Sequence, residues 1–196
     1  MCRYTLFIGL IMELDNRNIS DKYKFDRLTR WTTELIKEDL QKTAFPYAVV
    51  MENFAGDFNI GTVVRNANAF NARCVYYLGN KHWDRRGAVG THNYTDVKRI
   101  KTREELIKLK EEYTFVGVEN SVSGAVSLDK FEWPDRTLLF IGEEGIGITP
   151  ETLELCDRFV YIPQFGSVRS LNAGVASGIV MNDLITKINI KGAVSC

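Results

Sequence analysis

The sequence of 196 residues contains only four cysteines and two histidines, and its formal net charge at pH 7 is zero. None of the cysteines forms a Cys-x-x-Cys pair, and no histidine stands near any of them, which argues against a zinc site or any other metal centre. Cys74 lies in an apolar run and Cys156 near the end of a helical pattern. Both are typical of small core residues in a reducing compartment.

A long hydrophobic run is also missing. The apolar segment from Tyr4 to Met12 is well short of the ~20 residues that a membrane-spanning helix needs. One basic residue precedes it and no small-residue cleavage site follows it, which argues against a signal peptide. Since 45% of the residues are hydrophobic, the chain can bury one real core. We therefore expect a soluble, cytoplasmic protein with no membrane partner.

The absence of net charge gives no general sign of nucleic-acid binding, but the charge is unevenly distributed. Residues 81–103 hold seven basic and two acidic residues, a local excess of five positive charges. Trp83 stands in this segment before Arg85 and Arg86, and aromatic side chains beside basic ones are how flexible RNA is held. A solvated surface loop with a half-buried Trp83 would explain the same pattern equally well.

The order of elements predicts the fold class. Residues 1–45 are charged and partly helical in spacing, so they predict an N-terminal arm. Alternating strands and helices follow, which is typical of an α/β fold with a mostly parallel sheet and helices on both faces. The predicted strands are Tyr47–Met51, Arg73–Leu78, Tyr113–Val118, Thr137–Ile141 and Arg158–Ile162, and the predicted helices are 59–71, 102–112, 149–156 and 171–187. Thr102 and Thr149 are the expected N-caps of two of them.

Parallel sheets of this kind bind ligands outside the carboxyl ends of their strands. The loops to search are therefore 52–58, 119–125, 142–148 and 163–169. The glycines of Phe140–Ile148 permit a tight turn and a close backbone approach. Their spacing is not Gly-x-Gly-x-x-Gly, and no Walker-type Gly-Lys-Ser/Thr is present, so a nicotinamide or phosphate loop fits poorly.

The most informative segment is Phe159–Met181. An apolar strand is stopped by Pro163, a loop follows, and Ser170-Leu171-Asn172 opens a helix whose first residues are nearly all small. Each glycine within a helix costs about 1 kcal/mol relative to alanine. Gly174 and Gly178 therefore predict that another backbone, a ligand or a second subunit comes very close to this helix.

Three segments, in order, resemble the motifs of SpoU-type (TrmH-like) RNA 2'-O-ribose methyltransferases in the SPOUT superfamily. Asn59–Ala67 resembles the first motif, Phe140–Ile148 the second, and Ile162 to the helix after Asn172 the third. The resemblance covers roughly Pro46 to Lys187. It implies a methyltransferase domain at 46–188 with a C-terminal trefoil knot, a tail at 189–196, and a homodimer.

The resemblance also implies an activity, which is S-adenosylmethionine-dependent methyl transfer to the ribose 2'-hydroxyl of tRNA or rRNA, with Arg65 activating the hydroxyl. The chain departs from the family pattern in two places, because Glu143 stands where the family usually has Asn, and Ala173-Gly174 stands where it usually has Val-Ser. The implied catalytic residues are Arg65, Asn59, Glu144, Ser170 and Asn172; the implied cofactor-binding residues are Glu119, Gly142, Gly145, Ile162, Gln164 and Leu171; the expected RNA-binding residues are Arg85, Arg86 and Arg169.

Two other functions stay open. One is a non-catalytic RNA-binding relative with the same fold, which would give no heat when titrated with S-adenosylmethionine. The other is an unrelated enzyme that uses a nucleotide cofactor. Such enzymes have an acidic residue that binds the ribose at a fixed distance from the glycine motif, and the sequence has no acidic residue at that spacing. The short N-terminal arm slightly favours a small, accessible target such as a tRNA loop.

Overall fold

The computed structural model describes residues 32–54 and 58–194, with side chains described as far as residue 189. The chain divides into two units, residues 1–36 and residues 37–196, and the second contains the sheet. The apolar run Tyr4–Met12 and the predicted helix positions Leu28 and Trp31 lie outside the described residues. Cys2 and Cys196 also lie outside them.

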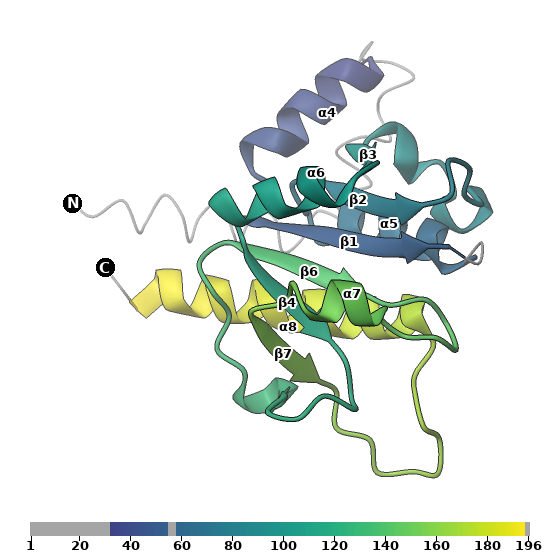
Figure 1. The fold of residues 1–196 in the computed structure, drawn as a ribbon. Coiled ribbons are helices and arrows are strands. Elements are labelled where there is room, and N and C mark those ends of the chain that lie inside the picture. The colour runs from purple at the N-terminus through teal and green to yellow at the C-terminus, as the bar shows by residue number, and fades with distance from the viewer. Residues whose placement is uncertain (1–31, 55–57, 195–196) are drawn as a thin grey trace. The chain divides into compact units, whose positions relative to one another are not determined.

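All strands of the seven-stranded sheet pair in parallel, in the order β3-β2-β1-β6-β4-β7-β5. The predicted α/β class with a parallel sheet is therefore confirmed (Figure 1). Two short edge strands, β3 and β5, were not predicted. The bounds are β1 Tyr47–Asn53, β2 Val75–Gly79, β3 Val97–Arg99, β4 Thr114–Val118, β5 Val126–Ser127, β6 Thr137–Ile141 and β7 Arg158–Tyr161.

Side chains alternate between the two faces of the sheet, as the period of a strand requires. In β1, Val49 lies opposite Val75 of β2 and Leu139 of β6, and all three belong to one core cluster. The next residue, Val50, belongs to a second cluster on the other face. Every residue of β1 is buried, because both faces are covered.

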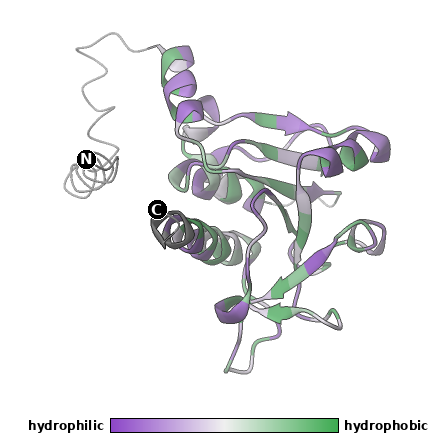
Figure 2. Ribbon diagram, turned by 90° about the vertical axis from the view of Figure 1, so that its left-hand side faces the viewer, coloured by the Kyte–Doolittle hydropathy of each residue, from purple (hydrophilic) through white to green (hydrophobic). Residues whose placement is uncertain are grey.

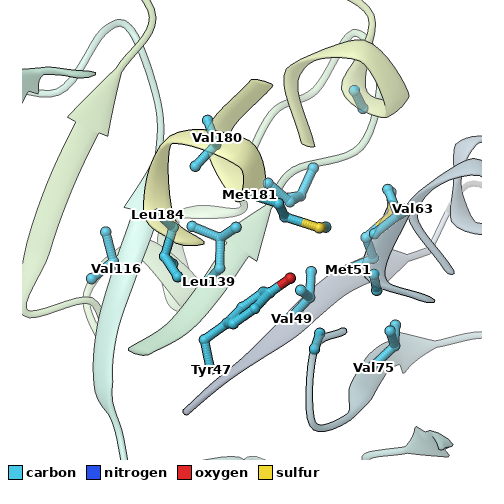
Figure 3. Close-up of a cluster of buried hydrophobic side chains, with 14 of the residues drawn as sticks. Tyr47, Val49, Met51, Val63, Val75, Val116, Leu139, Val180, Met181 and Leu184 are labelled. Atoms are coloured by element: carbon cyan, nitrogen blue, oxygen red, sulfur yellow. The ribbon is translucent and has the colours of Figure 1, made fainter. Parts of the chain in front are cut away.

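Helices α5 (Asn59–Ala69) and α8 (Ala173–Val194) cover one face, behind the sheet in Figure 1. Val180, Met181 and Leu184 of α8 point toward the sheet, where they meet β1 and β6 (Figure 3). Hydrophobic residues run along much of α8 and of the central strands (Figure 2). The helix starts two residues later than predicted and extends beyond the predicted end at Lys187.

Helices α6 (Arg103–Lys108) and α7 (Pro150–Leu153) cover the opposite face. The aromatic rings of Phe115 and Phe140 lie there with their centroids 5.1 Å apart. Thr102 caps α6 as predicted, since its hydroxyl oxygen accepts the backbone N–H of Glu105. Helix α7 is shorter than predicted, because residues 154 and 155 continue it only as a turn and Cys156 lies beyond that turn.

The remaining helices are short or lie in the predicted arm. Helix α4 (Thr33–Lys42) falls within residues 1–45, where the helical spacing predicted one. The 3-10 helices are η1 Arg86–Ala88, η2 Thr91–Asn93, η3 Leu109–Glu111 and η4 Leu128–Lys130. The first two belong to the basic segment and contact α5. The basic segment therefore packs against the domain and is not an open loop.

The two cysteines within the described residues are both free thiols. Burial raises the pKa of Cys74 to about 11 and that of Cys156 to about 12. Both thiols are therefore neutral at ordinary pH, as expected of core residues. Across the described ranges, no group of three His, Cys, Asp or Glu side chains is arranged to hold a metal ion, and no helix there is long and apolar enough to span a membrane.

Candidate active site

Polar side chains from all three sequence motifs meet at the carboxyl edge of the sheet. Asn59 Nδ2 donates to Glu144 Oε2 at 2.7 Å, and Asn172 Nδ2 donates to the same oxygen at 2.7 Å. Asn172 Nδ2 also lies 2.9 Å from Asn59 Oδ1. Asn59 begins α5, Glu144 follows β6, and Asn172 precedes α8, so three distant parts of the chain converge on one carboxylate.

Asn59 is a residue type that often caps helices, but it does not cap α5. Phe58 occupies the N-cap position and makes no side-chain capping bond. Asn59 is already the first helical residue, and its amide points to Glu144 instead of to the helix backbone. The amide therefore belongs to the candidate site.

Helix α8 is capped by Asn172 and not by Ser170. Asn172 Oδ1 accepts the backbone N–H of Val175 at 3.2 Å, and the Asn172 carbonyl accepts that of Ala176. Asn172 thus caps the helix with its oxygen and binds Glu144 with its nitrogen. Ser170 is exposed, two residues before the cap.

Arg65 lies on α5, six residues beyond Asn59, and its side chain is exposed. It points away from the buried face formed by Ile60, Val63 and Val64, as the helical spacing predicted. No hydrogen bond or ion pair joins Arg65 to any other residue that the structure describes. Its guanidinium is therefore available to a bound molecule.

The turn after β6 is closed by two backbone hydrogen bonds between Glu143 and Gly147. A Cβ at Gly142 would lie 2.2 Å from the Gly147 carbonyl carbon, so only glycine fits there. Gly145 and Gly147 have φ of +87° and +77°, which other residues rarely adopt. The sequence correctly predicted a tight turn with close backbone approach.

The loops after β4 and β7 lie beside this turn, because β6, β4 and β7 are neighbours in the sheet. Glu119 directly follows β4, and its Oε2 lies 2.8 Å from the position that a Cβ on Gly147 would occupy. Its other oxygen accepts the backbone N–H of Asn120 at 2.9 Å. Asn120 in turn donates to the carbonyl of Arg169 in the loop after β7.

These loops offer groups that fit the adenosyl part of S-adenosylmethionine. Ile162 and Leu171 are half-buried apolar residues that flank the loop after β7. The side-chain oxygen of Gln164 is buried and has no hydrogen-bond partner within the described residues, so it is an acceptor suited to a ligand N–H. The glycine turn allows backbone contact, and Glu119 is near it. The predicted cofactor residues thus lie on three neighbouring loops.

The small residues of α8 contact α5 of the same chain. A Cβ on Gly174 would lie 2.8 Å from Thr62 Cγ2, and one on Gly178 would lie 3.2 Å from Asn66 Nδ2. Asn66 Nδ2 donates to the Gly174 carbonyl at 2.8 Å and to Ser177 Oγ at 2.9 Å. The two glycines predicted the close approach of another backbone, a ligand or a second subunit. In the structure it is α5, another helix of the same domain, that approaches them.

The basic segment packs against the same helix. A Cβ on Gly61 would lie 2.9 Å from Gly87 Cα, so α5 and the segment 84–88 are in backbone contact. Arg85 is exposed, and its guanidinium carbon lies 5.8 Å from the centre of the Trp83 ring. Trp83 itself is half-buried against the core, which is the simpler of its two interpretations.

Several contacts were missed from the sequence. Glu52 is 1% exposed on β1, and its carboxylate accepts the backbone N–H and the hydroxyl of Thr149 at the start of α7. Glu143, which replaces the usual Asn, is also buried and accepts the backbone N–H of Phe54. Both carboxylates join the carboxyl end of β1 to the segment after β6. Acidic residues next to strand ends were the only available signal.

Comparison with known proteins identifies relatives with this architecture. The chain is 25% identical over 165 residues to a tRNA (guanosine(18)-2'-O)-methyltransferase of Aquifex aeolicus, covering 82% of this chain and 78% of that protein. It is 29% identical over 147 residues to the 23S rRNA (guanosine-2'-O-)-methyltransferase RlmB of Neisseria meningitidis, covering 70% of this chain but only 57% of that one.

A crystal structure with bound cofactor is also similar. It is that of the SpoU methyltransferase AviRb from Streptomyces viridochromogenes in complex with AdoMet, with a TM-score of 0.65 and 25% identity, covering 72% of this chain and 57% of that one. Together with the two named relatives, it confirms the predictions of a methyltransferase and of S-adenosylmethionine as its cofactor. The model of the SpoU rRNA Methylase family matches residues 46–182, which is more than half of the chain, so the chain belongs to this family.

Proposed function

We propose that this protein transfers the methyl group of S-adenosylmethionine to a ribose 2'-hydroxyl of tRNA or rRNA. The observation that carries the proposal is the convergence of Asn59 and Asn172 on the carboxylate of Glu144 at the carboxyl edge of the sheet. These residues come from the three motifs, and the loops proposed to hold the cofactor begin at the same edge. The relatives named above act on tRNA or on 23S rRNA, and both classes fit the proposal.

The sulfonium methyl of the bound cofactor is already electrophilic, so the protein has no covalent chemistry to perform. The ribose hydroxyl, however, is a very weak acid. Arg65 is exposed, without a partner among the described side chains, and an arginine stays protonated. We assign to Arg65 the electrostatic stabilisation of the alkoxide that develops as the proton leaves.

The polar cluster would position the ribose. Two amide groups hold the Glu144 carboxylate by hydrogen bonds of 2.7 Å, so its orientation is fixed before substrate binds. Fixing a hydroxyl in line with the methyl lowers the barrier because the reacting groups no longer need to find each other. Ser170, exposed in the loop before Asn172, would add a hydroxyl contact.

The cofactor would bind across the three loops that follow β6, β4 and β7. The Gly142 turn would contact it through its backbone, with Ile162 and Leu171 as apolar walls. Gln164 would supply its buried oxygen as an acceptor. Glu119 and Gly145 would shape the edge of the site. Arg85, Arg86 and Arg169 are exposed near these loops or on the adjacent basic segment, and would contact RNA phosphates.

The trefoil knot, the homodimer and the domain bounds stay predictions from the resemblance. The parallel sheet agrees with the first. The apolar side chains of Val175 and Ile179, which are 54% and 40% exposed on the outer side of α8, are suited to a contact with a second subunit. Light scattering coupled to gel filtration tests the dimer. A mass corresponding to one chain of 22.3 kDa would contradict it.

The assignment of Arg65 is tested by Arg65→Ala. Since the guanidinium is proposed to act only on the hydroxyl, kcat for RNA methylation should fall by about 10²- to 10³-fold while the affinity for S-adenosylmethionine is unchanged. Transfer of tritiated methyl to unfractionated tRNA and to rRNA measures the first quantity, and calorimetric titration measures the second.

Arg73→Ala is the matched control, because Arg73 is exposed just before β2, at the amino end of the strands. It should leave both quantities unchanged. Full turnover by Arg65→Ala would reject the role of Arg65. A wild-type protein that binds the cofactor but methylates neither RNA would instead favour the alternative of a non-catalytic RNA-binding relative.

A further inference from the structure

Phe58 is a large apolar side chain exposed beside the polar cluster. It is 70% exposed and directly precedes Asn59, whose amide binds Glu144. It occupies the N-cap position of α5 without making a capping bond. Since a phenylalanine contributes nothing to the cap and leaves most of its surface in water, the local fold gives no reason for an aromatic ring here.

A guanidinium already lies against this ring. The Arg86 guanidinium carbon is 5.9 Å from the centre of the Phe58 ring, within the range of a cation–π contact. Arg86 is held in turn by Asp84, because its Nε donates to both carboxylate oxygens at 3.1 and 2.9 Å and its Nη2 donates to one of them. The planar group is therefore oriented, although the Arg86 side chain is 83% exposed.

The position of Arg86 relative to α5 is set by backbone packing. A Cβ on Gly87 would lie 2.9 Å from the backbone nitrogen of Thr62, and a Cβ on Gly61 would lie 2.8 Å from that of Ala88. With both glycines in place, the segment that carries Asp84 and Arg86 can lie directly on the first turn of α5. Phe58 and Arg86 thus form one surface next to Asn59.

We propose that Phe58 and Arg86 form a stacking surface for an unpaired nucleobase of the RNA, the base next to the ribose that is methylated. This inference rests on the proposed function. Unpaired bases are held by stacking on aromatic rings and guanidinium planes, which tolerates different bases because each has a π-face. Trp83 is less suited, since it packs against the core and already makes an edge-to-face contact with His92, with the two ring centroids 6.1 Å apart.

Two variants of Phe58 and one of Arg86 test the surface. Phe58→Leu keeps an apolar side chain but removes the π-face, and should raise the KM for unfractionated tRNA about tenfold. Phe58→Trp offers a larger face and should retain the wild-type KM. Arg86→Gln removes the guanidinium and should raise KM about threefold. Ile107→Ser, which removes an exposed apolar side chain from α6 on the other face of the sheet, is the control and should change nothing.

The affinity for S-adenosylmethionine and the melting temperature are measured for the same variants, and both should equal the wild-type values. An unchanged KM in Phe58→Leu would overturn the proposal, and so would an equal loss in Phe58→Leu and Phe58→Trp. A parallel loss of cofactor affinity would also overturn it, because it would indicate a structural role.

If the wild-type protein methylates no RNA, the proposed function fails, and the stacking surface is tested separately by fluorescence anisotropy with labelled tRNA. The Phe58→Leu variant should then bind about tenfold more weakly than Phe58→Trp. Equal affinities would overturn the stacking surface, and an absence of RNA binding by wild-type protein would do the same.

Discussion

The two faces of the sheet are covered in different ways. Between α5 and α8 the contacts are made by small and polar residues, with Gly174 and Ser177 joined to Asn66 by hydrogen bonds. The opposite face, under α6 and α7, is filled by bulky apolar residues such as Phe115 and Leu138. Both faces have a buried apolar core, but only the contact between α5 and α8 joins two helices that begin at the candidate site. The difference indicates a division of work, in which the α5–α8 contact fixes the geometry of the candidate site, whereas the side chains under α6 and α7 contribute to stability without positioning it.

A large cavity in the second face should produce the greatest loss of stability. Phe115→Ala removes a fully buried ring that packs against Phe140, and should lower the free energy of unfolding by about 3–5 kcal/mol. Urea unfolding measures this. Because Phe115 lies toward the amino end of β4, away from the site, the protein that stays folded should keep its affinity for S-adenosylmethionine. A specific loss of that affinity would contradict the division.

A smaller change in the first face should act mainly on activity. In Gly174→Ala the new Cβ would meet Thr62 at 2.8 Å, so α8 must shift along α5, and Asn172 at its start would move away from Glu144. Overpacking of this kind costs about 1–3 kcal/mol. We expect kcat for methyl transfer to fall by about tenfold or more, with a modest loss in the urea midpoint.

The matched control is Gly178→Ala, whose Cβ would meet only the amide end of Asn66 at 3.2 Å. A side-chain end can move by a few tenths of an ångström, so this variant should keep most of its activity. Comparable losses of kcat in the two glycine variants would show that the start of α8 is not specially positioned.

The buried thiol of Cys74 gives the smallest effect. Burial raises its pKa from 9.0 to about 11, so the neutral thiol is favoured in the folded state. The buried neutral thiol contributes fully to the free energy of unfolding below pH 9. This contribution is lost as the pH rises from 9 to 11, because in that range the Cys74 thiol ionises in the unfolded chain while it is still neutral in the folded protein. The free energy of unfolding should fall by about 1 kcal/mol more in wild type than in Cys74→Ala between pH 9 and 10. Identical pH slopes would contradict this.

The sequence predicted the central strands well because their apolar, β-branched runs need no information from elsewhere. The predicted Thr137–Ile141 agrees with β6 at both ends. Strand β3 was missed because Val97–Arg99 contains Lys98 and Arg99 and pairs only at the sheet edge. Strand β5 has two residues, too few to form a pattern.

The site was predicted in part. The motifs pointed to Asn59, Glu144 and Asn172, but their mutual hydrogen bonds join residues 28, 85 and 113 positions apart, which no local pattern encodes. For the same reason Asn66 was overlooked, since its partners in α8 are 108 and 111 positions away. Close packing at Gly174 was predicted from the cost of a helical glycine, whereas its partner became known only from the fold.

We propose that the converging motifs form a site for ribose methylation, and mass spectrometry of nucleosides can show whether methyl groups reach the ribose. Unfractionated tRNA and rRNA are incubated with the wild-type protein and trideuteromethyl-labelled S-adenosylmethionine, digested to nucleosides and analysed. We expect label on the ribose of a 2'-O-methyl nucleoside with the wild-type protein, and only a small fraction of it with Arg65→Ala. Label found only on a base, or ribose label that persists undiminished in Arg65→Ala, would contradict it.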